Sequence, residues 1–182
     1  MDSISLYHYL EQLGSLITKP MKLTLIGSSI NLLKKQDNRM TPDIDVYMPK
    51  SKFDLNELKK INKQLGIKLD LPGEDINEND EYIQLISPGI IEMGVFEEQH
   101  FMTFGNLEVY IPPSEFVVAS KLRLVLDDNK HEADIQYLIN VDNLTSEKIL
   151  SAIDTFNFPD SEIAKENLVL FFYQKNKKLG PV

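Results

Sequence analysis

The chain has 182 residues, of which 42% are hydrophobic and 26% are charged, so it is long enough to bury a full-sized core. Its formal net charge is −9, which argues against an extensive nucleic-acid footprint because phosphate binding needs clustered Lys and Arg. The sequence contains no cysteine, which excludes a disulfide framework, a zinc–thiolate site and a thiol nucleophile.

The sequence also lacks the features of a membrane or secreted protein. No apolar run approaches the ~20 residues that a membrane-spanning helix needs. The N-terminal segment contains acidic residues and no basic start, unlike a secretory signal. We therefore expect a soluble, cytoplasmic protein with no membrane partner.

Helix-like and strand-like patterns alternate through the first half of the chain. Apolar residues recur at roughly helical spacing in the first segment, and short apolar runs that follow are typical of strands. The predicted elements are, in chain order, helix 3–18, strand 22–27, a helix from Ser28 or Ser29, strand 43–48, helix 52–66 and an acidic loop 70–81. Asp54 or Asn56 should cap the 52–66 helix, and Gly66 should end it.

The second half begins with strands and ends with helices. The predicted elements are strands 82–87, 89–96 and 106–112, followed by helices 112–126, 131–141, 145–156 and 160–178. This order predicts a compact α/β (α+β) domain with a helical C-terminal layer. An aromatic set near the C-terminus is expected in the core: Phe156, Phe158, Phe171, Phe172 and Tyr173.

Two aspartates, Asp43 and Asp45, stand one residue apart in the predicted strand 43–48. Residues i and i+2 of a strand point to the same face, so both carboxylates project together while Ile44 and Val46 point into the core. Neighbouring carboxylates raise each other's pKa, and a divalent cation removes that cost. The pattern indicates either a metal site or an exposed strand edge whose polar face holds two acids.

Upstream, the sequence LIGSS, residues 25–29, places a glycine and two serines between a predicted strand and a predicted helix. Backbone N–H groups at a helix N-terminus can hold a phosphate, and glycine lets a ligand approach the backbone closely. The alternative is purely structural. In that case Gly27 makes a tight turn and Ser28 or Ser29 caps the helix.

Taken together, the two motifs resemble those of the nucleotidyltransferase superfamily, which includes DNA polymerase beta and the tRNA CCA-adding enzymes. The closer resemblance is to the abortive-infection type, many of which are toxin-like. Their motif is Gly-Gly or Gly-Ser, a helix, and then Arg-x-Thr-x-Asp-hydrophobic-Asp. The residues that match it are Gly27, Ser28, Arg39, Thr41, Asp43, Ile44 and Asp45.

A second block extends the resemblance to roughly residues 20–140. The family carries Lys-Leu on a later helix, then a charged turn and an Asp-x-x-Asp-Ile-x-x-Leu pattern. The residues that match it are Lys121, Leu122, Glu132 in place of the first Asp, Asp134, Ile135 and Leu138. No motif covers the helices beyond this block.

The resemblance implies a nucleotidyltransferase-type short mixed sheet with flanking helices over residues 1–140, and a helical extension over 141–182 packed on it. It also implies that Asp43 and Asp45 bind Mg²⁺, two ions with a bound NTP, during transfer of a nucleoside monophosphate to an acceptor hydroxyl. The acceptor could be an RNA end, a protein or a small molecule. The implied nucleotide-binding residues are Gly27, Ser28, Arg39, Thr41 and Lys121.

Several of these roles have alternatives. Lys121 could be a surface lysine whose stem covers apolar residues, and Arg39 could pair with the two aspartates instead of the substrate. The family's third catalytic carboxylate is matched best by Glu92 on the predicted strand 89–96. Asp70 is a weaker match. If Gly94 takes that place, the site is incomplete, and the chain would be a catalytically degenerate nucleotidyltransferase fold that binds a protein partner such as an antitoxin.

Overall fold

The computed structural model describes residues 1–124 and 129–178, with side chains described for 1–124 and 130–173. Over these residues the chain forms seven α-helices, one short 3-10 helix and a six-stranded sheet with parallel and antiparallel pairs. The predicted mixed α/β class is therefore confirmed. No helix of the described residues is long and apolar enough to cross a membrane.

Contacts divide the chain into two units. The first unit comprises residues 1–90 and 98–112, and the second comprises residues 91–97 and 113–182. The chain therefore crosses between the units more than once. None of these crossings falls at residue 140, and the predicted division into residues 1–140 and 141–182 stays a prediction.

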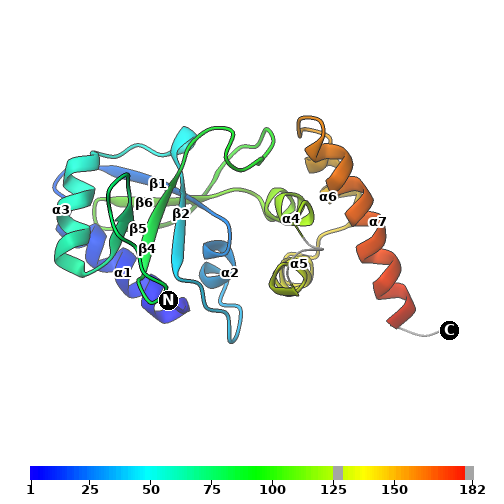
Figure 1. Ribbon diagram of the computed structural model, residues 1–182, viewed down its shortest axis with the longest axis horizontal. Helices are drawn as coiled ribbons and strands as arrows, with labels where there is room; N and C mark the ends of the chain where they lie inside the picture. Colours follow the sequence, from blue (N-terminus) through cyan, green and yellow to red (C-terminus); the bar gives the residue numbers. More distant parts are fainter. Residues whose placement is uncertain (125–128, 179–182) are drawn as a thin grey trace. The chain divides into compact units, whose positions relative to one another are not determined.

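The first unit holds the sheet and the helices that pack on it (Figure 1). Its elements are α1 (Ser3–Leu16), β1 (Met21–Ile26), α2 (Ser29–Leu33), β2 (Asp43–Tyr47), the 3-10 helix η1 (Met48–Lys50), α3 (Leu55–Leu65), β3 (Lys68–Asp70), β4 (Tyr82–Ile86), β5 (Gln99–Phe104) and β6 (Leu107–Ile111). The strand order is β3-β4-β2-β1-β6-β5. Strands β1 and β2 are antiparallel, whereas β2 with β4 and β1 with β6 are parallel.

One face of this sheet is apolar and covered by the three helices. Helix α1 contacts β5 and β6 as well as α2 and α3, while α2 contacts β1 and β2 and α3 contacts β3. Leu23, Leu25, Ile44, Val46 and Ile83 are almost fully buried, which fits the alternation of side chains along paired strands. Polar side chains of β1, β2 and β4 therefore project from the opposite face.

Helix α3 shows why the local sequence predicts its own boundaries. The Asp54 side chain accepts hydrogen bonds from the backbone N–H groups of Asn56 and Glu57, which would otherwise lack partners inside the helix. Gly66 ends the helix with a left-handed φ of 75°, a conformation that glycine adopts without steric cost. The predicted end at Gly66 is confirmed, and of the two proposed caps Asp54 is the one observed.

The predicted strand 89–96 is wrong. Its residues form turns and irregular backbone, and from residue 91 onward they belong to the second unit. Gly89 and Gly94 have φ values of 84° and 66°, which interrupt the extended backbone that a strand requires. Met93 and Phe96 are buried, so the apolar residues of this segment pack in a loop instead of pairing in a sheet.

Two strands, β3 and β5, have no counterpart among the predicted elements. Both lie at the edges of the sheet, where backbone hydrogen bonds to one neighbour suffice to hold a strand. β3 has only three residues, too few for a periodic pattern. β5 is largely exposed and contains an irregularity between His100 and Met102, so its side chains do not alternate cleanly.

The second unit is helical and consists of α4 (Ser114–Leu122), α5 (Asn129–Val141), α6 (Ser146–Ile153), α7 (Asp160–Lys178) and the segment 91–97. Helix α4 packs against α5, α6 and α7. Of the aromatic residues expected in the core, Phe156 is buried. The expectation is wrong for Phe158 and Tyr173, which are 81% and 57% exposed.

Candidate functional site

Strand β2 carries Asp43 and Asp45 on the face of the sheet opposite the helices. Ile44 and Val46 are almost fully buried beneath them, so the alternation of the strand sends the two carboxylates to the same side. Asp45 is only 8% exposed, whereas Asp43 is partly exposed. This pair is the starting point of the candidate site.

Gly27 lies directly against the Asp45 carboxylate. The antiparallel pairing of β1 with β2 sets Ile26 opposite Asp45, so the turn that follows Ile26 begins beside the acid. Gly27 has a φ of 64°, and a Cβ placed on it would lie 2.0 Å from Asp45 Oδ2. No side chain fits in this space unless the Asp45 carboxylate moves.

Ser28 follows the glycine and is bonded to Arg39. The Arg39 guanidinium donates from Nη2 to Ser28 Oγ at 2.6 Å and from Nη1 to the carbonyl oxygen of Met40. Helix α2, which begins after Ser28, has only five residues, and the Ser28 side chain does not cap it. Any phosphate contact here would therefore depend on the Gly27–Ser28 turn and Arg39 more than on a long helix.

Thr41 orients the first aspartate. Its hydroxyl donates to Asp43 Oδ1, and its backbone N–H donates to the carbonyl oxygen of Met1 at 3.0 Å. Thr41 is buried, and the amino terminus of Met1 forms an ion pair of 2.6 Å with Glu81. The loop that precedes β2 is therefore tied to the start of the chain, and one oxygen of Asp43 is held by a neutral donor.

The strands on either side of β2 place no third carboxylate in register with Asp45. Its partner on β4 is Gln84, and its partner on β1 is Ile26. Asp70 pairs with Gln84 from the far side, one strand further away. Among the described residues, no group of three or more His, Asp or Glu side chains is arranged to hold a metal ion.

The pKa of Tyr82 is affected by the negative charges on this face of the sheet. It pairs with Asp43 across β4 and β2. Burial raises the pKa of Tyr82, and the charges of Asp43, Asp70 and Asp45 raise it further. The three carboxylates thus lie near one phenol, although they do not converge on a single point.

Glu92 occupies a different setting from the predicted one. It lies in the irregular 91–97 segment of the second unit, where its carboxylate accepts hydrogen bonds from the Gly94 N–H at 2.8 Å and from Asn157 Nδ2 at 2.9 Å. Gly94 itself packs against Thr155 and Phe156, where an added Cβ would clash. Within this unit Glu92 fastens the segment to Asn157 in the stretch that follows α6, and the prediction that it stands on a strand of the sheet is wrong.

Lys121 is buried in the second unit. Its ammonium group lies 2.8 Å from Asp134 Oδ2, and the side chains are 7% and 0% exposed. The alternative of a surface lysine is therefore wrong, while the role of Lys121 in nucleotide binding stays a prediction. The sequence resemblance had paired these two positions in one motif, and the structure shows that they form a buried ion pair between α4 and α5.

The donor set of the first unit fits a hard cation. Asp43 and Asp45 supply carboxylate oxygens from one strand face, and Gln84 adds a neutral amide beside them. Mg²⁺ is commonly bound by one or two carboxylates, with substrate phosphates and water completing its coordination. The Gly27 turn lies directly against Asp45, since a Cβ on Gly27 would overlap the Asp45 carboxylate, so the backbone of the turn and the acid are immediate neighbours.

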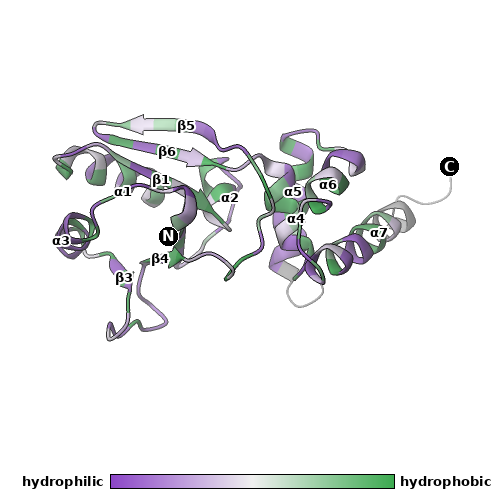
Figure 2. Cartoon of the chain, turned by 90° about the horizontal axis from the view of Figure 1, so that it is seen from above, coloured by the Kyte–Doolittle hydropathy of each residue, from purple (hydrophilic) through white to green (hydrophobic). Residues whose placement is uncertain are grey.

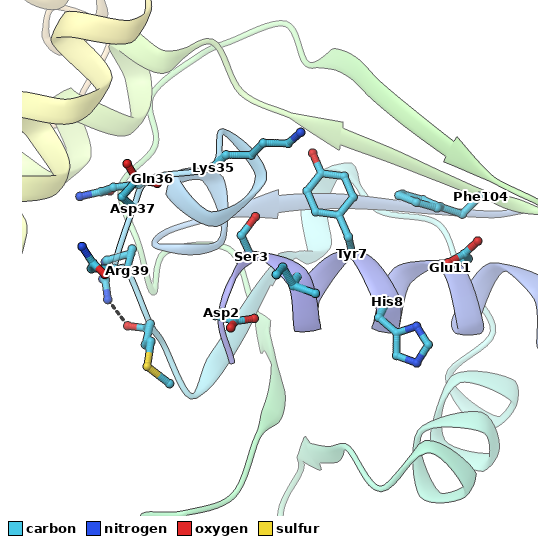
Figure 3. A pocket seen from close by; sticks show the side chains of 13 residues that line it. Asp2, Ser3, Tyr7, His8, Glu11, Lys35, Gln36, Asp37, Arg39 and Phe104 are labelled. Atoms are coloured by element: carbon cyan, nitrogen blue, oxygen red, sulfur yellow. Dashed lines mark hydrogen bonds between the residues drawn. The ribbon is translucent and has the colours of Figure 1, made fainter.

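A broad groove of about 1000 Å³ in the first unit had no signal in the sequence (Figure 3). It is bordered by α1, the loop 35–40 and Phe104, and neither Asp43 nor Asp45 lines it. Tyr7 projects into it, with its hydroxyl bonded to the carbonyl oxygen of Leu33 at 2.9 Å. Arg39 lines the groove and also contacts Ser28, so the groove adjoins the candidate site.

Comparison with known proteins does not assign the chain to a family. No protein-family model, curated protein or solved structure matches the chain. The resemblance to nucleotidyltransferases therefore rests on the sequence motifs alone.

Proposed function

We propose that the first unit is a metal-dependent nucleotidyltransferase, which transfers a nucleoside monophosphate from an NTP to an acceptor hydroxyl. The close approach of Gly27 to the Asp45 carboxylate is the observation that carries this proposal. It joins the two motifs that the sequence places eighteen positions apart, from Gly27 to Asp45. A tight turn that merely reversed the chain would not need its glycine packed directly against a buried carboxylate.

Different residues of the site would bind the metal ion and the phosphate groups of an NTP. Asp43 and Asp45 would hold Mg²⁺, which when bound would neutralise phosphate charge and stabilise the attacking and leaving oxygens. The backbone at Gly27 and the hydroxyl of Ser28 would contact phosphate oxygens, with Arg39 supplying positive charge. Thr41 would keep Asp43 oriented through its hydrogen bond.

A second candidate function follows from Gln84. This neutral residue stands beside Asp45 on the strand where a further carboxylate would complete the site. An amide cannot accept a proton from an acceptor hydroxyl as a carboxylate does. On this reading the first unit binds a nucleotide or a protein partner through the same surface and catalyses no transfer.

Calorimetric titration of NTPs, with and without Mg²⁺, tests the proposal on the wild type and on Asp45→Asn. Asp70→Asn is the matched control, because Asp70 is an exposed acid on the neighbouring part of the sheet. The proposal requires Mg²⁺-dependent binding that Asp45→Asn abolishes and Asp70→Asn retains. A well-folded wild type that binds no NTP contradicts it.

Transfer itself is then measured with α-³²P-labelled NTPs. Incorporation of label into an RNA, protein or small-molecule acceptor favours the enzyme, and Gln84→Glu should preserve or increase it. Mg²⁺-dependent binding without any transfer favours the degenerate site.

A further inference from the structure

Helix α7 of the second unit has an apolar middle that its own unit covers only in part. Residues 168–173 read LVLFFY, and no charged residue occurs between Glu166 and Lys175. A soluble helix normally carries one apolar stripe and one polar face. Apolar residues on all sides indicate that more than one face of a helix is covered by protein.

The covered face of α7 is well defined. Ala164, Asn167 and Leu168 are buried, and the Asn167 amide donates to the carbonyl oxygen of Leu122 at 2.6 Å. The helix contacts α4 and α6. This face anchors α7 within its own unit.

The opposite face exposes an apolar stripe. Val169, Leu170 and Tyr173 are 69%, 44% and 57% exposed, and Ile163 is 40% exposed one to two turns earlier. Tyr173 lies three residues after Leu170 and four after Val169, and Leu170 lies seven after Ile163, which places the four residues along one side of the helix. Figure 2 shows the apolar residues in the middle of α7.

The charges of α7 are arranged in opposite blocks around this stripe. Residues 160–166 contain Asp160, Glu162, Lys165 and Glu166, a net charge of −2, although Asp160 pairs with Arg123 and Glu162 with Lys165. Residues 175–178 contain three lysines. The same order stabilises a single helix through its dipole, so charge alone does not require a partner. Combined with an exposed apolar middle, however, it gives a surface that is complementary to its own copy in the antiparallel direction.

We infer that α7 pairs with α7 of a second copy of this chain, antiparallel and centred on Val169. Val169 is the midpoint of Asp160–Lys178 and the most exposed apolar residue of the helix. A two-fold axis at this position sets the acidic start of each helix beside the lysine-rich end of the other and joins the two apolar middles. A parallel pair would instead bring like charges together. The interface is isologous, as is usual for homodimers.

Sedimentation equilibrium of the full chain is the first test. The mass of the wild type should be twice 20.9 kDa at high concentration. Val169→Asp should halve it, because the two-fold axis sets the two introduced carboxylates against each other. Val95→Asp is the control, since Val95 is an exposed apolar residue of the same unit outside α7. It should remain dimeric, and circular dichroism should show that both variants are folded.

Cysteine cross-linking tests the direction of the helices, because the chain contains no cysteine. In the antiparallel pair the thiols of V169C meet at the axis, whereas those of I163C are about 18 Å apart along the helices. A disulfide requires Cα atoms within ~7 Å, so oxidation should link V169C and leave I163C unlinked. A parallel pair would link both variants.

Three results overturn the inference. A wild type that is monomeric at every concentration shows that another surface of the same chain, or a different protein, covers the stripe. A Val169→Asp variant that stays dimeric places the interface elsewhere. Cross-linking of I163C as readily as V169C contradicts the antiparallel arrangement.

Discussion

The Cα of Gly27 lies against the carboxylate of Asp45, so close that a Cβ would come within 2.0 Å of Oδ2. Two strands that pair antiparallel bring together these residues, which are eighteen positions apart in the chain. This contact brings together two sequence motifs, each of which alone is weak evidence for a binding site.

Gly27→Ala should destabilise the protein and disturb Asp45. The left-handed φ alone costs about 1–2 kcal/mol for a residue with a Cβ, and displacement of a buried carboxylate adds to that cost. Gly73→Ala is the matched control, since Gly73 has a φ of 88° with no atom within 4 Å of the added Cβ. Urea denaturation should show a larger loss for Gly27→Ala, and equal losses in the two variants would contradict the close contact.

Thr41→Val should weaken Mg²⁺-dependent NTP binding without unfolding the protein. The substitution keeps the size of the buried side chain and removes the hydrogen bond to Asp43. A bond to a charged group contributes about 1.5–3 kcal/mol, so affinity should fall roughly tenfold or more. Calorimetry measures the effect, and Thr103→Val, which removes a hydroxyl bonded to the His100 ring, serves as a control on β5.

Lys121→Met should be strongly destabilising. It leaves the Asp134 carboxylate, which is 0% exposed, without its ammonium partner. Removing one member of a buried ion pair typically costs about 3–5 kcal/mol. Thermal unfolding should show the loss, and the double variant Lys121→Met/Asp134→Leu should recover much of it. If the single variant is as stable as the wild type, the pair does not contribute to the fold.

The stability contributed by Glu92 should depend on pH. Burial raises the pKa of this carboxyl, but hydrogen bonds from Gly94 and Asn157 outweigh that effect and hold the pKa below its ordinary value of 4.5. A carboxyl with a depressed pKa in the folded state stabilises it above the ordinary pKa, and the contribution disappears as the pH falls through the folded-state pKa. Wild type should therefore exceed Glu92→Gln in stability at pH 7.

Denaturation of both proteins between pH 7 and acidic pH measures this effect. The difference in free energy of unfolding should shrink as the pH falls below 4.5. A difference that stays constant over this range would show that the two hydrogen bonds do not distinguish the ionised carboxyl from the neutral one.

Local sequence was sufficient for those parts of the fold that depend on neighbouring residues. The helix that Asp54 caps and Gly66 ends was predictable because both signals act within a few residues of the helix. The shared face of Asp43 and Asp45 follows from the two-residue period of a strand. The mixed α/β class follows from the order of the elements.

Tertiary structure decided three other features. They are the hydrogen-bond partners of Glu92, the short edge strands β3 and β5, and the residue that stands beside Asp45 in the sheet. Strand pairing decided that Gln84 stands beside Asp45, and no local pattern reveals which strands become adjacent. Gly94 was placed within a predicted strand, and its actual packing against Thr155 and Phe156 depends on residues about sixty positions away. Lys121 likewise becomes buried only when α4 and α5 pack together. Long-range contacts determine which charged side chain is removed from solvent, and which oppositely charged side chain then pairs with it.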